Sequence, residues 1–345
     1  MHNYENALRR IKGEPRAWLV TGAAGFIGSH LVEHLLGLGQ KVAGLDNFST
    51  GKRANLTDVR ARVGEAAWAN FRLLESDICS AEACRRACSG IDVVLHQAAL
   101  GSVPRSIDDP VASHQSNVDG FVNMLVAARD AGVGRFVYAS SSAVYGDHPA
   151  LPKVEDVTGR AVSPYGLTKQ IDELYAQVFE ACYGFRAIGL RYFNVFGPRQ
   201  DPNGAYASVI PAWIGALLRG ETAYVNGDGT AARDFCHIDN VVQANLLAAT
   251  VGDPAALGQA YNIALGDQTS LLELFSIIGG IMGLKDARPV HREPRKGDLQ
   301  FSRADTSKAE RLLGYRPSVR IMEGLKKTVE WYAENIAPRT EVAHV

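Results

Sequence analysis

Trp18-Leu-Val-Thr21-Gly22-Ala-Ala-Gly25-Phe-Ile-Gly28 is the stretch that decides the fold of this chain. A short β-rich run leads into the first glycine, and an apolar helical pattern starts immediately after the second. Glycines at this spacing let a pyrophosphate approach the backbone at the N-terminus of a helix. The same triplet also occurs in ordinary strand–turn–helix connections, so its meaning depends on the rest of the chain.

Strand-like and helix-like segments alternate through the first 195 residues. The expected strands are 17–21, 41–45, 71–74, 93–96, 136–140 and 187–192, and the clearest helical patterns are 26–38, 116–131 and 164–183. Ser163, Pro164 and Gly184 are suited to begin and end the last of these helices. Such alternation is typical of a parallel sheet covered on both faces, so the sequence predicts an α/β, Rossmann-type doubly wound fold.

Asp46 lies 18 residues beyond Gly28, at the end of the second expected strand. A carboxylate there can accept hydrogen bonds from an adenosine ribose and would repel a 2′-phosphate. Position 47 is Asn rather than Arg, which favours NAD over NADP, although Lys52 and Arg53 follow closely enough to keep NADP open. The alternative interpretation of Asp46 is a solvated loop aspartate.

Tyr165-Gly-Leu-Thr-Lys169 places a phenol and an ammonium one helical turn apart, on one face of the helix. A free tyrosine ionises only at about pH 10, but a nearby ammonium and a positive nicotinamide ring favour phenolate. Ser141, at a strand end, can relay the proton or hold a substrate hydroxyl. Together these groups suit the removal of a proton from a sugar alcohol beside a nicotinamide. The alternative is a surface Tyr–Lys pair and a capping serine.

No acidic residue follows Ser141, because the next positions are Ser142, Ala143 and Val144. Dehydration or decarboxylation of a sugar would be expected to use an additional acid or base in this stretch. The sequence offers none there.

The composition of the chain indicates which binding partners and which cellular location to expect. The 36 basic and 37 acidic residues nearly balance and form no polybasic run, so we expect neither a nucleic-acid nor a membrane partner. The N-terminus lacks a secretory signal pattern, and no segment approaches the ~20 apolar residues that span a bilayer. Five cysteines without a CxxC pair argue against a disulfide framework and favour a cytoplasmic location. Cys84 and Cys88 have a spacing that zinc ligands use, but nothing completes a site, so no metal is expected.

The regular alternation of strand-like and helix-like segments stops at about residue 196, where a turn-rich loop precedes shorter helices and irregular connections. We therefore expect residues 1–195 to form an NAD-binding Rossmann domain, with segments around 234–264 returning to it. Residues 196–345 would mainly form a smaller α/β substrate-binding region.

These features resemble the extended short-chain dehydrogenase/reductase family, specifically its nucleotide-sugar 4-epimerases. The resemblance covers nearly the whole chain. It is carried by Leu45-Asp-Asn-Phe-Ser-Thr-Gly51, His96-Gln-Ala-Ala-Leu-Gly-Ser-Val-Pro-Arg-Ser106, Leu190-Arg-Tyr-Phe-Asn-Val-Phe-Gly197 and Arg233-Asp-Phe-Cys-His237. Residues 97–106, 145–149 and 199–206 are similar to the branch that acts on UDP-N-acetylhexosamines in bacterial surface-polysaccharide biosynthesis.

The resemblance implies a role for each matching position. The cofactor NAD would contact Gly22, Gly25, Phe26, Ile27, Gly28, Asp46, Asn47, Ser49, Thr50, Gly51, Asp77, Ile78, Gln97, Tyr165, Lys169 and Val195. The sugar or its phosphates would contact Ser102, Ser141, Ser142, Tyr165 and Asn194; the uridine pocket would be lined by Val209, Trp213, Tyr224 and Asn226. The diphosphate and ribose would be held by Arg233 and Arg295, with Asp298 nearby, and Ser302 would lie beside the sugar 2-substituent. A guanidinium fork suits a diphosphate.

The implied activity is an isomerase, an NAD-dependent 4-epimerase that interconverts UDP-N-acetylglucosamine and UDP-N-acetylgalactosamine through a transient 4-keto sugar. The same reaction on UDP-N-acetylglucosaminuronate is one alternative, and a catalytically silent NAD-binding sensor or scaffold is another. The family also implies a homodimer through the helices at 116–131 and 164–183. Ala143, Gln268 and Gln300 depart from the family pattern and leave the exact sugar open.

Overall fold

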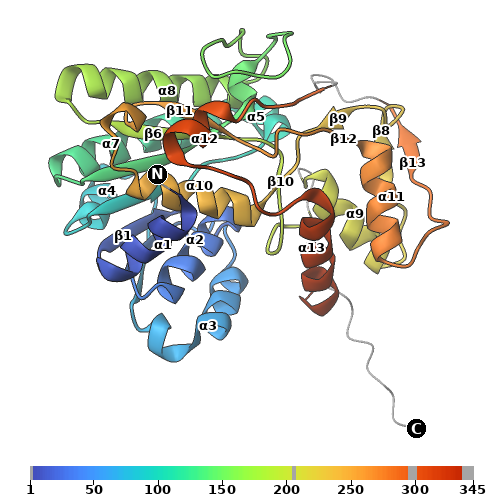
Figure 1. Ribbon diagram of the computed structural model, residues 1–345, viewed down its shortest axis with the longest axis horizontal. Helices are drawn as coiled ribbons and strands as arrows, with labels where there is room; N and C mark the ends of the chain where they lie inside the picture. Colours follow the sequence, from blue (N-terminus) through green and yellow to red (C-terminus); the bar gives the residue numbers. More distant parts are fainter. Residues whose placement is uncertain (1–2, 204–206, 294–300, 336–345) are drawn as a thin grey trace.

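The computed structural model describes residues 3–203, 207–293 and 301–335. Its centre is a seven-stranded parallel sheet with the strand order β11–β6–β5–β4–β1–β2–β3 (Figure 1). The strands are β1 (Ala17–Thr21), β2 (Lys41–Asp46), β3 (Phe71–Glu75), β4 (Val93–His96), β5 (Arg135–Ser141), β6 (Ala187–Tyr192) and β11 (Ala260–Ile263). The predicted Rossmann-type α/β fold is confirmed.

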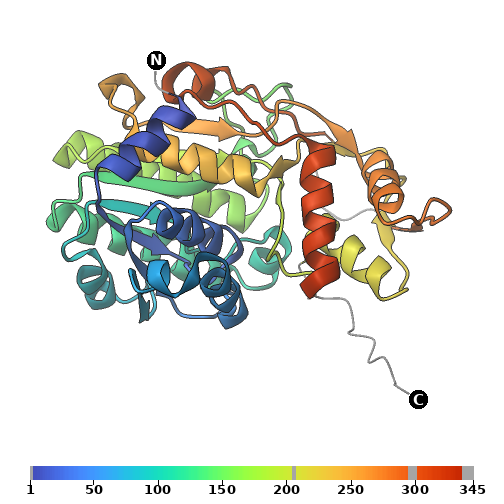
Figure 2. The same cartoon turned by 60° about the horizontal axis from the view of Figure 1, so that its bottom comes forward.

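Each face of the sheet is covered by its own layer of helices. Side chains alternate along β1, so that Trp18 and Val20 enter one core and Leu19 enters the other. The first layer comprises α1 (Tyr4–Gly13), α2 (Phe26–Gly37), α3 (Arg53–Trp68) and α10 (Ile238–Thr250). The second comprises α4 (Ala81–Cys88), α7 (Gly120–Asp130) and α8 (Pro164–Tyr183). Figure 2 shows α1 lying beside α10.

Helix α8 has the boundaries that its sequence predicts. The Ser163 hydroxyl accepts a hydrogen bond from the Gly166 backbone N–H at 3.0 Å, and Pro164 occupies the first turn. Gly184 ends the helix in the left-handed conformation, with φ of 66°. The long helix therefore has fixed ends, and its residues one turn apart share a defined face.

The helix expected over 116–131 begins instead as a π-helix, η1 (Gln115–Asp119), before α7. Asn117 lies in this wide turn. Its Nδ2 donates to the Thr168 hydroxyl of α8 at 3.1 Å, and its Oδ1 accepts from the Leu100 backbone N–H at 2.7 Å. The local widening thus ties the loop after β4 to α8, as such bulges often do at functional sites.

The second half of the chain builds a separate hydrophobic core beside the sheet, on the right of Figure 1. This core contains α9 (Val209–Leu218), α11 (Leu271–Ile281), α13 (Ile321–Asn335) and β8 (Tyr224–Asn226), with β13 (Val290–Arg292) paired to β8. Short pairs join β7 (Val195–Phe196) to β10 (Cys236–His237) and β9 (Ala232–Arg233) to β12 (Thr269–Ser270). In the described ranges the remaining α-helices are α5 (Val103–Asp108), α6 (Pro110–His114) and α12 (Ser307–Leu313), and two short 3₁₀ helices are η2 (Ser142–Tyr145) and η3 (Pro254–Ala256). A domain boundary at residue 196 stays a prediction.

Strand order reverses between β1 and β4, which are direct neighbours in the sheet. Ligands of open parallel sheets bind beyond the carboxyl ends of the strands at such a point. The glycine turn follows β1 and Gln97 follows β4, so both lie at this edge. Among the described helices, none is both long and apolar enough to cross a membrane.

Candidate active site

The turn after β1 requires glycine at two positions. Gly22 has φ of 65°, and a Cβ added to it would lie 2.9 Å from the Ala98 backbone nitrogen. A Cβ added to Gly28 would lie 2.0 Å from the carbonyl oxygen of Gly22. Only glycine at position 28 allows α2 to pack this closely against the turn.

The first turn of α2 is built to receive an anion. Gly25 is its N-cap and supplies no side-chain capping bond, and no acidic residue lies in the first turn. The backbone N–H groups at a helix N-terminus have no partner within the helix and carry partial positive charge. These groups fit the pyrophosphate of a dinucleotide.

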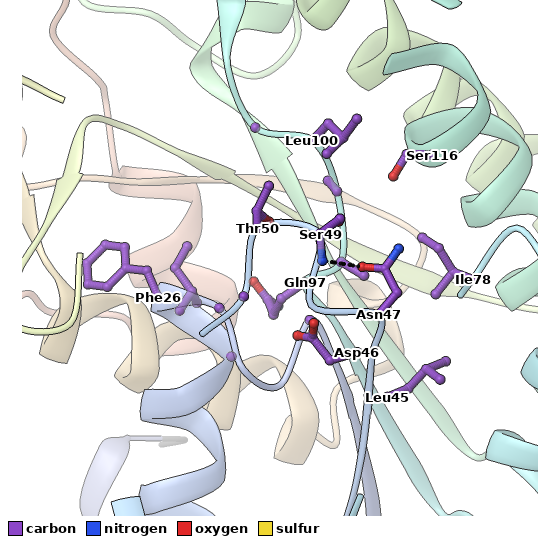
Figure 3. Close-up of a pocket in the computed structure, with 18 of the residues that line it drawn as sticks. Phe26, Leu45, Asp46, Asn47, Ser49, Thr50, Ile78, Gln97, Leu100 and Ser116 are labelled. Carbon is purple, nitrogen blue, oxygen red and sulfur yellow. Dashed lines mark hydrogen bonds between the residues drawn. The ribbon is translucent and has the colours of Figure 1, made fainter. Parts of the chain in front are cut away.

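A cavity of 260 Å³ lies directly over this turn (Figure 3). It brings together most of the residues expected to contact the cofactor: Gly22, Gly25, Phe26, Ile27, Gly28, Asp46, Asn47, Ser49, Thr50, Gly51, Ile78 and Gln97. Asp77 lies just behind this lining, where it accepts a hydrogen bond from Asn47 Nδ2 at 2.7 Å. The expected residues from four strand ends therefore converge on one concave site.

Asp46 is buried and held by the backbone, so it is not a solvated loop aspartate. Its Oδ2 accepts from the Ala24 N–H at 2.8 Å and its Oδ1 from the Phe48 N–H at 2.7 Å. Each carboxylate oxygen can accept a further bond. The carboxylate is thus fixed at the cavity, where it suits an adenosine ribose and repels a 2′-phosphate.

The two cations that kept NADP open are both engaged by carboxylates. Lys52 Nζ lies 2.8 Å from Asp201 Oδ2. Arg53 donates to the Glu75 carboxylate at 2.7 Å and stacks over the Phe48 ring. Neither side chain is directed to a separate phosphate, so the residues present fit NAD.

A second cavity, of 820 Å³, adjoins the first and shares Phe26, Ile27 and Gln97 with it. It is lined by the predicted residues Ser102, Ser141, Ser142, Tyr165, Lys169, Asn194, Val195, Val209, Arg233 and Ser302. Cavities of this size are typical of small-molecule sites. The structure thus brings the proton-transfer groups together in the wall of the second cavity, which adjoins the first.

Three other predicted substrate contacts, Trp213, Tyr224 and Asn226, are not among the described residues that line the second cavity. The Trp213 indole is buried in the second core and donates to the Tyr224 carbonyl at 2.8 Å. Tyr224 and Asn226 lie on β8, and Arg292 stacks on the Tyr224 ring. Their role in a uridine pocket stays a prediction. Arg295 and Asp298 lie outside the described residues.

The catalytic candidates are not a surface pair, because Lys169 is only 2% exposed. Its Nζ lies 3.0 Å from Asp172 Oδ2, one turn farther along α8. Tyr165 faces the cavity, and its backbone N–H donates to the Ser106 hydroxyl at 3.0 Å. Ser141 lines the cavity while its Oγ also accepts from the Ala143 N–H at 3.1 Å, so it caps a turn as well.

Burial and charge define the protonation states around Lys169. Burial alone would lower the pKa of Lys169, but the charges of Asp172 and Tyr165 outweigh it and raise that pKa. Burial raises the pKa of Asp172 to about 7, against the opposing effect of Lys169. Burial, with a smaller contribution from Lys169, lowers the pKa of His96 to about 3 and keeps its imidazole neutral.

Sequence reasoning missed the residues that position Gln97 between the cavities. Tyr192 donates from its hydroxyl to Gln97 Oε1 at 3.1 Å, and Gln97 Nε2 donates to Asn245 Oδ1 at 3.2 Å. The sequence signal that could have found them is Asn245, a polar residue within the largely apolar helix α10. Within the described ranges, no group of His, Cys, Asp and Glu side chains could hold a metal ion.

Comparison with known proteins shows which family has this sequence and fold. The model of the NAD dependent epimerase/dehydratase family matches residues 18–264. A "UDP-glucose 4-epimerase" of Mycolicibacterium smegmatis is 40% identical over 91% of this chain and 97% of its own.

Two solved structures have the same fold. The "UDP-N-acetylglucosamine 4-epimerase from Methanobrevibacter ruminantium M1 in complex with UDP-N-acetylmuramic acid" is 35% identical, with a TM-score of 0.86 over 93% of this chain and 99% of its own. A Thermus thermophilus UDP-glucose 4-epimerase in complex with NAD is 35% identical, with a TM-score of 0.81 over 93% of this chain and 100% of its own. Family and neighbours agree with the cofactor that the cavity fits, and the cofactor of this chain is NAD.

The purified protein is expected to retain NAD, because the glycine turn at the α2 N-terminus fits its pyrophosphate and the fixed Asp46 carboxylate fits its ribose. Heat denaturation should release NAD or NADH, with little or no NADP, measurable by chromatography of the supernatant. Recovery of NADP, or an absolute need for added NADPH, would contradict the role given to Asp46.

Proposed function

Because this chain belongs to the NAD dependent epimerase/dehydratase family, we propose that it is a 4-epimerase that interconverts UDP-N-acetylglucosamine and UDP-N-acetylgalactosamine. The observation that carries the proposal is Tyr165 facing the larger cavity with the buried Lys169 one turn later, and Ser302 in the wall of the same cavity. Bound NAD supplies a hydride acceptor that returns the hydride in the same cycle.

The residues of the chain handle the proton and the orientation of the sugar. Tyr165, as phenolate, takes the proton of the 4-hydroxyl as the alcohol becomes a ketone, and returns it when the alcohol reforms. Lys169 stabilises the phenolate by its positive charge. Ser141 holds the reacting oxygen from the β5 end. Exposure of the opposite face of the 4-keto sugar before re-reduction inverts carbon 4. The intact set of Ser141, Tyr165 and Lys169 in one cavity disfavours a silent sensor.

The wall beside Ser141 favours epimerisation over dehydration within this family. Ser142 and Ala143 occupy the cavity lining directly after Ser141, and neither can act as an acid. Elimination of water from the sugar needs an additional acid or base next to the reacting carbons. A reaction that only oxidises and re-reduces carbon 4 needs no such group.

The charges lining the larger cavity favour a neutral sugar over a uronate. Among the lining residues that the structure describes, the cations are Lys169 and Arg233. Lys169 is paired with Asp172, and Arg233 is the group we assign to the diphosphate. A sugar carboxylate would need a further cation or donors of its own, because a desolvated charge without a partner is costly.

Ser302 leaves room for an N-acetyl group at carbon 2 of the sugar. Its side chain is 6% exposed, faces the cavity and accepts a weak hydrogen bond from Asn194 Nδ2 at 3.3 Å. Its hydroxyl therefore does not merely cap the turn before Asp305, whose carboxylate accepts from the Ser307 N–H at 2.8 Å instead. A small residue here supports an acetylated substrate.

We also propose a cytoplasmic homodimer that contributes to polysaccharide biosynthesis, with α8 as its contact surface. Leu167, Ile171, Leu174 and Val178 follow one another at spacings of four, three and four residues. This spacing forms the apolar seam of packed helices. Leu174 is 58% exposed in the single chain, and the seam borders a 470 Å³ cavity against α6. A second copy of α8 would cover it.

The assignment is tested by incubating the purified protein, without added cofactor, with UDP-N-acetylglucosamine, UDP-glucose and UDP-N-acetylglucosaminuronate. Chromatography should show conversion of the neutral acetylated sugar to its 4-epimer at the highest kcat/KM. Tyr165→Phe keeps the ring and removes the base, so turnover should fall roughly 10²- to 10⁴-fold while NAD stays bound. Preferred turnover of the uronate would overturn the substrate, and undiminished turnover by the Phe variant would overturn the base.

Ser302→Tyr is expected to fill the space beside carbon 2. Overpacking typically costs ~1–3 kcal/mol, so kcat/KM should fall roughly 5- to 150-fold on UDP-N-acetylglucosamine and much less on UDP-glucose. Ser302→Ala is the matched control and should preserve the preference. Equal losses on both substrates would remove the physical reason for assigning an acetylated sugar.

Leu174→Glu places a charge in the apolar seam and should convert the protein from dimer to monomer in sedimentation velocity. Met322→Glu is the control, because Met322 is also exposed, at 45%, but lies on α13. The control should sediment as the wild type does. A Leu174→Glu protein that is still dimeric would show that α8 is not the contact surface.

A further inference from the structure

Two acidic side chains follow Lys169 within one turn of α8, but only one of them reaches its ammonium. Glu173 is committed elsewhere: its carboxylate accepts from Arg191 Nε at 2.9 Å and Nη2 at 2.7 Å, and from the Ser140 hydroxyl. Asp172 has no such partners. Among the described residues, Asp172 Oδ2 is the one hydrogen-bond acceptor for Lys169 Nζ, at 3.0 Å.

Among the residues that the structure describes, the other oxygen of Asp172 has no hydrogen-bond partner. Asp172 is 0% exposed, and its Oδ1 is buried without a donor within reach. A buried carboxylate normally has several donors, because its desolvation is costly. Within the described ranges the charge of Lys169 is what compensates this carboxylate, so the pair differs from a fully satisfied structural ion pair.

We propose that Asp172 is a positioning residue for the reaction: its negative charge keeps the proton of the Tyr165–Lys169 pair on Lys169 when Tyr165 ionises. Asp172 does not line either cavity and so does not touch the substrate or NAD. It acts through Lys169, whose position and charge it fixes from behind.

Tyr165 and Lys169 titrate as two coupled groups. When the pair loses one proton, it becomes either phenolate with ammonium or phenol with neutral amine. Asp172 stabilises every form that keeps a positive charge beside it. Because Lys169 is in contact with Asp172 while Tyr165 lies about two helical turns before it on α8, the carboxylate favours the phenolate–ammonium form, which is the reactive one.

Removal of the Asp172 charge should therefore change both the pH at which the Tyr165–Lys169 pair loses its first proton and the share of the pair that is then phenolate. The first proton leaves the pair at lower pH, since the proton-bound form loses its stabilising carboxylate. A smaller share of the pair is then phenolate, because the unpaired buried ammonium is the easier group to neutralise. The remaining phenolate should form only at higher pH.

Other titratable groups on the elements around this part of α8 stay the same in wild type and variant. They include His96, Arg105, Asp108, His114, Asp119, Tyr138, Tyr145, Arg191, Tyr192 and, on α8 itself, Glu173. Burial raises the pKa of Tyr138 well above its ordinary value and that of Tyr145 to about 12, so neither mimics the signal of Tyr165 at moderate pH. Measurements above neutral pH keep Asp172 charged, because burial places its pKa at about 7.

The test is a titration of the ultraviolet phenolate absorbance of the holoprotein, with the matching Tyr165→Phe protein subtracted in each case. Wild type should show one phenolate step. Asp172→Asn should show a first step at lower pH with reduced amplitude, and the maximal kcat should fall about 10-fold or more, short of the ~10²–10⁴-fold loss of the base itself. Asp172→Ser is a second neutral variant in case the first does not fold.

Two further variants separate charge from structure. Asp172→Glu keeps the charge and should restore the single step, even if kcat stays reduced. Glu180→Gln removes a carboxylate from the same helix about 16 Å from Lys169 along its axis and should titrate as wild type does. The inference rests on Tyr165 as the proposed base, but the titration needs no substrate, so a wrong sugar assignment leaves it unaffected.

A wild-type titration in the neutral variants, or an Asp172→Glu protein that titrates like Asp172→Asn, would overturn the proposal. The first result would make Asp172 a purely structural residue. The second would show that shape rather than charge is what position 172 supplies.

Discussion

The close approach of helix α2 to the turn after β1 is the constraint on which the rest of the structure depends. The hydrogen atom of Gly28 occupies a place where a methyl group would lie 2.0 Å from the Gly22 carbonyl oxygen. That contact fixes where the helix N-terminus points, and therefore where a pyrophosphate can bind. Asp46 and Gln97 then meet the same edge because parallel strands carry their carboxyl ends to one side of the sheet.

The second requirement is a protonated amine that is kept away from water. Lys169 is buried, and burial opposes its charge, yet the proposed reaction needs that charge beside a phenolate. One helix positions all of these groups. Ser163 and Pro164 fix where α8 begins, and Tyr165 then faces the cavity. Asp172, one turn after Lys169, pairs with its ammonium and keeps it charged. The chemistry thus depends on the register of α8 as much as on the identity of its residues.

The parts of this molecule that follow from local sequence could be predicted, and those that follow from contacts between distant segments could not. The strand ends agree within about one residue, because apolar runs bounded by glycine and capping residues define them. The π-helix at Asn117 was not predictable, since it depends on Thr168 across the fold. The contact of Asp172 with Lys169 was also missed, because a charged residue on a helix usually faces solvent. The indole of Trp213 packs in the second core, and its place in a uridine pocket stays a prediction.

In the proposed reaction, carbon 4 of the sugar is oxidised and re-reduced with the same hydride, while only the hydroxyl proton passes through Tyr165. Reaction with UDP-N-acetylglucosamine in deuterium oxide, followed by mass spectrometry and NMR of the 4-epimer, tests it directly. The hydride never exchanges with solvent, so the product should carry no deuterium on carbon. Deuterium at carbon 4 or at carbon 5 would contradict the account, because it would require removal of a carbon-bound proton to water.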